Sequence, residues 1–243
     1  MKDKMSQDLK NSEFYSSVEI KDFYKLSFAK NDTVIGKILS EGRPWEPEIT
    51  KLIEGLVKEN STFIDVGANI GVHTVGVANR VNCSVEAFEP IQFQLNILQN
   101  NIKLNNLENR VNVNPVGLTN QNTVDNKKFQ VPEEIFDLSK PANYGGHGLI
   151  IAESEDNIIP MKTMDSFNFT NVSVIKIDVE GHEQEVLEGS FETIRNNKPH
   201  LVVEIWDDLL TKFQASPINQ LFFELDYGVT KMTEMDYLFS PKS

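Results

Sequence analysis

Two acidic side chains and a glycine-bearing turn are spaced in a way that suits a nucleoside ligand. Residues 63–71 read Phe-Ile-Asp-Val-Gly-Ala-Asn-Ile-Gly, a short apolar run that ends in a turn. Gly67 lets the backbone turn tightly and approach a ligand, and the N–H groups at the start of a following helix favour an anionic or zwitterionic ligand. Asp65 can reach the cationic end of such a ligand. Glu89, at the tip of the next expected strand, can accept hydrogen bonds from both ribose hydroxyls.

The same turn departs from the dinucleotide-binding fingerprint. That fingerprint, Gly-x-Gly-x-x-Gly, requires glycine where this chain has Asn69 and Val72. What remains is Asp-x-Gly-x-x-x-Gly, the turn of S-adenosylmethionine (SAM) methyltransferases, whose ligand brings a carboxylate and an ammonium group instead of a pyrophosphate. SAM is therefore the expected cofactor, and an NAD oxidoreductase is a weaker alternative. In the plainest alternative the glycines only mark a turn and Glu89 is a solvated charge.

A second group of polar side chains follows the expected strand 172–179. Methyl transfer from a sulfonium to a hydroxyl needs an aligned acceptor and removal of its proton. Asp178 is the first candidate for the base or the acceptor anchor, followed by Glu180 and His182, for which helix capping is the competing role. Glu204 interrupts an apolar run, and a buried carboxylate needs a partner. It is expected either to point into the site or to form a structural pair.

Carboxylates at these positions also raise the question of a metal ion. Asp178 with Glu180 or Glu204 would supply the hard oxygen ligands that Mg²⁺ prefers, and some sugar O-methyltransferases use such a metal. Spacing does not establish a metal site, so the expectation is a reaction without one. If an ion binds, Asp178 and Glu204 are the expected ligands.

A polar excursion at 119–162 interrupts the regular pattern of the chain. So long a stretch inside a compact domain is usually built for a site. Within it, the glycine-rich run at 143–148 permits close approach to a ligand or the hinge of a lid. The alternative is a plain surface turn.

The elements that must position these groups alternate between short strands and helices. Apolar residues at helical spacing and short apolar runs predict the elements. Helices are expected over 47–58, 71–81, 91–104, 184–195 and from 217, and strands over 62–66, 84–88, 110–116, 128–131, 148–152, 172–179 and 200–206. A hairpin over 228–239 is expected to turn near Glu234. The alternation implies a parallel sheet with helices on both faces.

Length and composition limit the classes of protein that remain. The 243 residues carry 36 Asp and Glu against 23 Lys and Arg, a formal net charge of −13. This charge disfavours nucleic acid as a partner, since nonspecific affinity for it depends on Lys and Arg. There is no apolar run of about 18 residues and no signal-peptide pattern at the start, so no membrane association is expected. The single cysteine, Cys83, fits a reducing compartment, and we expect a cytoplasmic protein.

One domain with an appendage is the simplest organisation. Residues 1–42 are expected to form an N-terminal arm of short elements packed on the core. Residues 43–243 are expected to form a SAM-dependent methyltransferase domain, with 119–162 as a site-forming insertion. The sequence leaves the oligomeric state open.

Taken together, the motifs resemble those of FkbM-type SAM-dependent methyltransferases. The resemblance covers about 43 to 206, and its most specific part is the block Asp-Val-Glu-Gly-His-Glu. The segments that carry it are Trp-Glu-Pro-Glu at 45–48, the turn at 63–71, Glu-Ala-Phe-Glu-Pro at 86–90, the Asn-rich helix end at 100–106, Thr-Met-Asp-Ser-Phe at 163–167 and the block at 175–183. It implies an α/β class I methyltransferase Rossmann-like fold, a seven-stranded, mostly parallel sheet with an antiparallel C-terminal strand and helices on both faces.

The resemblance also implies a set of site residues and a reaction. The chemistry would be methyl transfer to an oxygen, commonly of a sugar or polyketide. His73 is expected to contact SAM through its backbone while its ring packs on the helix. The expected cofactor-binding residues are Glu48, Asp65, Gly67, Ala68, Asn69, Gly71, His73, Glu89, Pro90, Gly117 and Asp178. The run at 143–148 resembles the Asn-Gly-Gly loop that the family has near the cofactor and the acceptor, which makes Asn143, Gly146 and His147 candidates for contacts to the acceptor substrate.

The predicted function is therefore SAM-dependent O-methylation of a hydroxyl on a sugar, a glycan or a related small molecule. An RNA ribose 2′-O-methyltransferase is one alternative, because Asp178 and Glu204 could fill two positions of its Lys-Asp-Lys-Glu site. The acidity disfavours it, and strand alternation is taken to turn Lys176 away from the Asp178 pocket. A catalytically silent SAM-binding protein is the other alternative.

Overall fold

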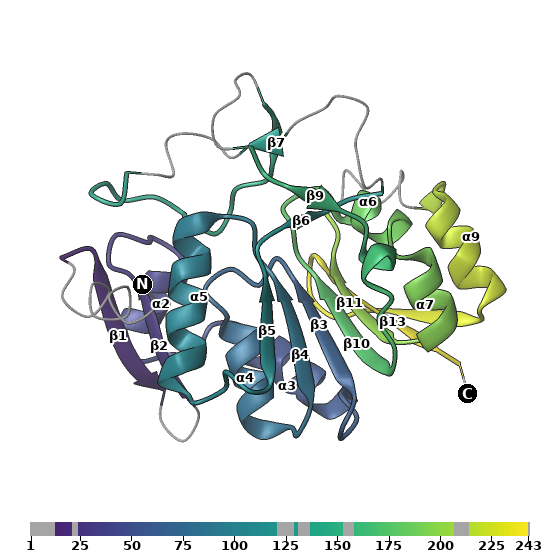
Figure 1. The fold of residues 1–243 in the computed structure, drawn as a ribbon, viewed down its shortest axis with the longest axis horizontal. Coiled ribbons are helices and arrows are strands. Elements are labelled where there is room, and N and C mark those ends of the chain that lie inside the picture. The colour runs from purple at the N-terminus through teal and green to yellow at the C-terminus, as the bar shows by residue number, and fades with distance from the viewer. Residues whose placement is uncertain are drawn as a thin grey trace.

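A seven-stranded sheet forms the centre of the molecule (Figure 1). The computed structural model describes residues 13–20, 24–120, 129–130, 137–152, 158–206 and 214–242. Across the sheet the strand order is β12-β13-β11-β10-β3-β4-β5. These strands are β3 Thr62–Val66, β4 Ser84–Phe88, β5 Val111–Asn114, β10 Val172–Ile177, β11 His200–Glu204, β12 Tyr227–Lys231 and β13 Asp236–Pro241.

The direction of the strands confirms the predicted fold class. Neighbours from β11 through β10, β3 and β4 to β5 run parallel, whereas β13 is antiparallel to both β11 and β12. The predicted C-terminal hairpin is thus the β12–β13 pair. All six residues of β10 are buried, as expected for a strand covered on both faces.

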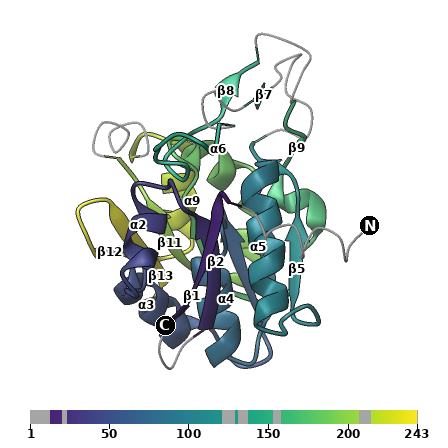
Figure 2. The same cartoon turned by 90° about the vertical axis from the view of Figure 1, so that its left-hand side faces the viewer.

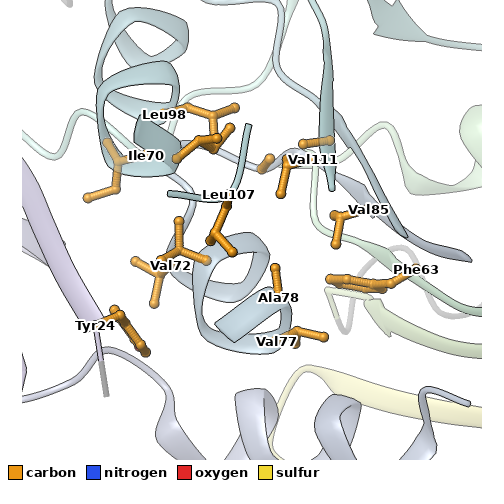
Figure 3. Close-up of a cluster of buried hydrophobic side chains, with 14 of the residues drawn as sticks. Tyr24, Phe63, Ile70, Val72, Val77, Ala78, Val85, Leu98, Leu107 and Val111 are labelled. Carbon is orange, nitrogen blue, oxygen red and sulfur yellow. The ribbon is translucent and has the colours of Figure 1, made fainter. Parts of the chain in front are cut away.

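Helices cover both faces of the sheet. On one face lie α3 Pro47–Leu56, α4 Val72–Arg80 and α5 Gln92–Leu104. On the other lie α6 Glu183–Glu188, α7 Phe191–Asn197 and α9 Pro217–Glu224. The hydrophobic cluster between the sheet and the helices α3, α4 and α5 is called the first core. Figure 3 shows it: Val72 and Val77 of α4 pack between Tyr24 and the strand residues Phe63 and Val85.

The single helix predicted over 184–195 is wrong. The chain instead forms α6 and α7, separated at Gly189 and Ser190. A side chain at Gly189 would collide with the backbone of Thr119. The break therefore follows from a tertiary contact, which the helical spacing of apolar residues does not show.

The segment before α3 packs on the first core. A hairpin of β1 Tyr15–Ile20 and β2 Tyr24–Ala29 lies across α4 and α5, followed by the short helix α2 Ile35–Ser40 (Figure 2). Leu26 and Phe28 of β2 are buried in the same cluster as α4 and α5. No finding tests the expected domain boundary after residue 42, which stays a prediction; residues 1–12 and 21–23 lie outside the described part.

The excursion at 119–162 carries small two-stranded sheets above the carboxyl ends of β3–β5 (Figure 1). Of the strands predicted over 128–131 and 148–152, the structure has β7 Phe129–Gln130 and β8 Ile150–Ile151, which pair antiparallel; Lys128 and Val131 are not among the described residues. A parallel pair, β6 Gly117–Leu118 and β9 Met161–Lys162, closes the excursion. Among the helices that the structure describes, none is both long and apolar enough to cross a lipid bilayer.

Candidate active site

The carboxyl ends of β3, β4 and β10 border an open pocket of about 630 Å³. This volume includes solvent at the open mouth, so what marks the pocket as a ligand site is its place at the carboxyl edge of a parallel sheet. Apolar side chains, among them Ile91, Val116 and Leu118, form one part of its wall, and polar groups form the rest. Gly67 has a φ of 79°, and a side chain there would collide with the carbonyl of Asp178, so the turn lies directly against the end of β10.

Glu89 lies in the pocket wall at the tip of β4, as the sequence predicts. Its side chain is buried, and its two carboxylate oxygens accept hydrogen bonds from the N–H groups of Asn69 (2.9 Å) and Ile91 (2.7 Å). Burial raises its pKa to about 7, helped by the negative charges of Asp65 and Asp178 and opposed by the two N–H groups. Each oxygen keeps a lone pair for a ligand hydroxyl.

Most N–H groups of the glycine turn itself, as distinct from those of the helix that follows it, are already occupied. The N–H groups of Gly67 and Ala68 both donate to the carbonyl of Phe88, and that of Gly71 donates to Ala68. The Asn69 N–H is bound to Glu89. These bonds lock the turn onto the end of β4, so a ligand must rely on side chains and on the first turn of α4.

Gln94, which the sequence reasoning missed, also lines the pocket. Its side chain is 2% exposed, and its Nε2 donates to Asn69 Oδ1 (3.1 Å) and to the carbonyl of Tyr144 (3.0 Å). Within the described part of the chain, its Oε1 is buried without a hydrogen-bond partner. A glutamine on the buried side of a helix is the signal that could have identified it.

Beside the pocket, charged side chains lie on one face of adjacent strands. Lys176 pairs in register with Val202 of β11, and two residues further along, Asp178 and Glu204 come side by side. Asp236 of β13 is the register partner of Glu204. Because side chains two residues apart on a strand share a face, these groups gather at the carboxyl edge next to Gly67.

The predicted orientation of Lys176 is wrong. Its Nζ lies 2.9 Å from Asp178 Oδ2, and its side chain is 4% exposed. Residues 176 and 178 are two apart, so alternation places them on the same face. Although burial opposes the charge, the carboxylates of Asp178, Asp65 and Glu46 raise the pKa of Lys176, which keeps the ammonium group charged.

Asp178 and Glu204 differ in protonation. Burial would raise the pKa of Asp178, but the Lys176 ammonium and hydrogen bonds from Glu204 and Lys176 outweigh it and leave the pKa below its usual value. For Glu204, burial, the Asp178 charge and the shared hydrogen bond raise the pKa to about 9. Near neutral pH, Asp178 is therefore an ionised acceptor and Glu204 a neutral donor. Glu204 shares a hydrogen bond with Asp178 but is not among the residues that line the pocket, and whether it enters the site or forms a structural pair stays a prediction.

Glu180 completes the carboxylate group. Its backbone has a φ of 57°, a region that non-glycine residues rarely occupy and that often marks functional sites. Burial raises its pKa to about 7, with Asp178 and Glu183 adding to the effect. One oxygen each from Asp178, Glu180 and Glu204 lies within 4.8 Å of the others, close enough to share a cation.

His182 lines the pocket on the side of the excursion. Its Nε2 lies 3.2 Å from Thr119 Oγ1, and its ring meets that of Phe129 edge-on. Burial lowers its pKa, only partly offset by Glu185, so it is neutral at physiological pH. A neutral, hydrogen-bonded imidazole is suited to shaping the pocket wall.

The structure brings many of the predicted site residues to the pocket and keeps others away from it. Those that line it are Gly67, Asn69, Glu89, Pro90, Gly117, His147, Asp178, Glu180 and His182. Those not among the lining residues are Glu48, Asp65, Ala68, Gly71, His73, Asn143, Gly146 and Glu204.

Several residues of this second group support the pocket from behind. Asp65 is 1% exposed, and its Oδ2 accepts a hydrogen bond from Thr74. The side chain of Asn143 accepts a hydrogen bond from the N–H of Gly146 (3.1 Å) and so shapes its loop. Gly71 is the residue before α4 and has a φ of 88°.

Near α3, the acidic residue that contacts His73 is Glu46 and not Glu48. Pro47 begins the helix, so Glu48 is on its exposed first turn while Glu46 precedes it with a φ of 41°. Glu46 Oε2 lies 3.2 Å from His73 Nε2, and His73 Nδ1 lies 2.9 Å from Thr50 Oγ1. The His73 ring therefore joins α3 to α4, in keeping with its expected packing role.

Comparison with known proteins identifies a family for most of the chain. The family model described as "Methyltransferase FkbM domain" matches residues 65–238. No curated protein matches the chain.

Solved structures share the fold at low sequence identity. Methyltransferase FkbM from Methylobacillus flagellatus KT is 21% identical with a TM-score of 0.51, and the match covers 76% of this chain and 45% of that one. TYW2 from P. horikoshii, in complex with MeSAdo, is 13% identical with a TM-score of 0.50, covering 94% of this chain and 70% of that one. This chain thus spans less than half the length of the first of these proteins.

Proposed function

The chain belongs to the FkbM methyltransferase family, and on that premise we propose that it transfers a methyl group from SAM to a hydroxyl group of a sugar, a glycan or a related small molecule. One observation carries the proposal: an ionised carboxylate, Asp178, lies in the pocket wall where the glycine turn meets β10. A hydroxyl acceptor needs such a base, whereas a carboxylate acceptor would be repelled by it.

The residues present suit SAM. Glu89 offers acceptor lone pairs for the ribose hydroxyls, and the wall formed by Ile91, Val116 and Leu118 suits the apolar faces of an adenine ring. When bound, SAM supplies an electrophilic methyl group on a sulfonium. The chain itself must hold the acceptor oxygen in line with that methyl group and take up its proton.

Asp178 is the proposed base. Lys176 holds one of its oxygens at 2.9 Å, and neutral Glu204 shares a hydrogen bond with it. These two contacts fix the orientation of the carboxylate and leave lone pairs for the acceptor hydroxyl. Glu180, with a pKa of about 7, is placed to hold a neighbouring hydroxyl of the same acceptor or to pass the proton to solvent.

An exposed aromatic ring on the same face supports a sugar as the acceptor. Trp206 follows Glu204 by two residues, and the N–H of Ile205 still pairs with the carbonyl of Met235, so alternation puts the indole on the face of Glu204. The Trp206 side chain is 38% exposed, and Met235 beside it is 43% exposed. A pyranose has an apolar face that fits such a surface and hydroxyls that fit the carboxylates.

Ribose 2′-O-methylation of RNA is the second candidate. The grouping of Lys176, Asp178 and Glu204 provides three charged side chains of the kind that such sites use. The buried position of Lys176 and the net charge of −13 weigh against binding a polyanion. Sugar hydroxyls therefore remain the preferred acceptors.

The test is transfer of a labelled methyl group from SAM to a panel of glycosides, glycan fragments and short RNA. The expected result is label on a glycoside or glycan, with the position located by mass spectrometry. Label on RNA alone would favour the second candidate. SAM binding without transfer to any acceptor, in a panel that includes free amines and carboxylates, would speak for a silent binder.

A further inference from the structure

The N-terminal segment reaches the cofactor pocket through the stretch 137–149. Residues 31–33 and Ala142 form a bridge in which the N–H of Thr33 donates to the carbonyl of Ala142 (2.9 Å) and the N–H of Ala142 to that of Asn31 (3.1 Å). The side chain of Asn31 adds a third bond, from Nδ2 to the carbonyl of Leu138 (2.9 Å). Both backbone and side chain thus join the two segments.

From this bridge, the stretch continues over the glycine turn. Tyr144 is 2% exposed, and its ring packs edge-on against Phe93 of α5 at 5.6 Å between centroids. Its hydroxyl donates to the carbonyl of Lys140 (2.6 Å), and its own carbonyl accepts the bond from Gln94 Nε2. Through its second bond, to Asn69, Gln94 links the stretch to the turn.

Gly145 lies in the narrowest part of this contact. A Cβ added there would lie 2.6 Å from Asn69 Nδ2 and 3.3 Å from Ile35 Cδ1, an atom of helix α2. The glycine is therefore held between the turn on one side and the N-terminal segment on the other. Gly145, His147 and Leu149 then form part of the pocket wall.

We propose that the N-terminal segment is part of the cofactor-binding site, with Asn31 and Gln94 as positioning residues that hold 142–149 as a preformed wall. The matched family region begins at residue 65, so it does not include this segment. A wall that is already ordered spares the ligand the entropy of ordering it, which raises affinity. The inference rests on the proposed function for the identity of the ligand, an adenosyl compound.

Titration of the full chain with S-adenosylhomocysteine, the demethylated cofactor, tests the proposal. Asn31→Ala removes the bond to Leu138 and leaves the buried core intact, so we expect Kd to rise about three- to tenfold, as for the loss of one hydrogen bond. Gln94→Leu removes two bonds at the turn and should raise Kd further. In Asn31→Ala, KM for SAM should rise while kcat stays close to the wild-type value.

Asn105→Ala is the matched control. Asn105 also fixes the N-terminal hairpin, through bonds with the backbone N–H (3.0 Å) and carbonyl (2.7 Å) of Lys25, but at a point that contacts neither the pocket wall nor the turn. It should lower thermal stability at least as much as Asn31→Ala and leave Kd unchanged. Unchanged Kd in Asn31→Ala, or an equal rise in both asparagine variants, would overturn the proposal. If the wild-type chain binds no S-adenosylhomocysteine, it is the cofactor assignment that fails.

Discussion

The Nζ of Lys176 lies 2.9 Å from Oδ2 of Asp178, and the two side chains differ sharply in exposure, 4% for the lysine and 33% for the aspartate. The ammonium group is fixed inside the sheet, whereas the carboxylate reaches the pocket. In such an ion pair, the charge of the buried lysine lowers the pKa of the more exposed carboxylate and so keeps that carboxylate ionised. Removing the lysine should therefore change the chemistry of Asp178 more than its position.

We predict that Lys176→Met raises the pKa of Asp178. A cation at this distance typically lowers a carboxylate pKa by about 1–3 units, so its loss should move the acidic limb of the kcat/KM profile upward by about one unit or more. Activity near pH 5 should fall more than activity near pH 8. Lys176→Arg keeps the charge and should keep the wild-type limb. An unshifted limb in the methionine variant would show that the pair does not govern the base.

Asp178→Asn should bind S-adenosylhomocysteine normally and lose turnover. A positioned base contributes about 10²–10⁴-fold, so a loss of this size in kcat is expected. Asp226→Asn is the control, because Asp226 is an exposed carboxylate paired with Lys242. Wild-type turnover in Asp178→Asn would move the base to another group.

The fold was predictable where local sequence decides structure. The strands at 62–66 and 84–88 coincide with their predicted bounds, because each is a short apolar run that ends in polar or glycine residues. The break at Gly189 was not predictable, since it depends on the backbone of Thr119, seventy residues earlier in the chain. The spacing of apolar residues shows which face of a helix is buried, but it does not show which distant segment of the chain packs against that helix.

The identities of several site residues were predictable from the sequence, whereas most of the contacts between them were not. Motif order identified Glu89 and Asp178, both of which lie in the pocket wall. The lysine beside Asp178 could have been found by applying strand alternation correctly. Glu46 depends on how α3 begins, which local spacing does not show. Gln94 carried one local signal, its place on the buried side of α5, but its contact with Tyr144 depends on how the stretch 137–149 folds back.

Binding of the cofactor should depend on pH through Glu89. Its pKa is raised to about 7, mainly by burial, and only the ionised carboxylate can accept hydrogen bonds through both oxygens. Because ionisation is lost as pH falls through 7, affinity for S-adenosylhomocysteine should drop about tenfold between pH 8 and pH 6. Calorimetric titration at several pH values measures this. In Glu89→Gln, binding should be weak and nearly independent of pH, and a wild-type slope in that variant would assign the titration elsewhere.

Glu204 should make the protein less stable at high pH. Its pKa is raised from 4.5 to about 9 in the folded state, so between these values the folded chain holds a proton that the unfolded chain has released. The stabilisation is complete below about pH 4.5 and is lost as pH rises through 9. Glu204→Gln does not titrate, so the wild type should lose Tm relative to it between pH 5 and pH 9, by roughly 2–4 °C per kcal/mol. Parallel Tm curves, measured by scanning calorimetry, would contradict the raised pKa.

Activity should survive removal of metal ions. The carboxylates of Asp178, Glu180 and Glu204 are close enough to share a cation, but Lys176 already occupies one side of Asp178 and Glu204 is protonated near neutral pH. A divalent ion would have to displace the Glu204 proton and lie near an ammonium group, both of which oppose binding. Treatment with a chelator at pH 7 should therefore leave the transfer rate unchanged, and added Mg²⁺ should not raise Tm. If the chelator abolishes activity and Mg²⁺ restores it, most strongly as pH approaches 9, the three carboxylates form a metal site and the neutral Glu204 described above is its metal-free state.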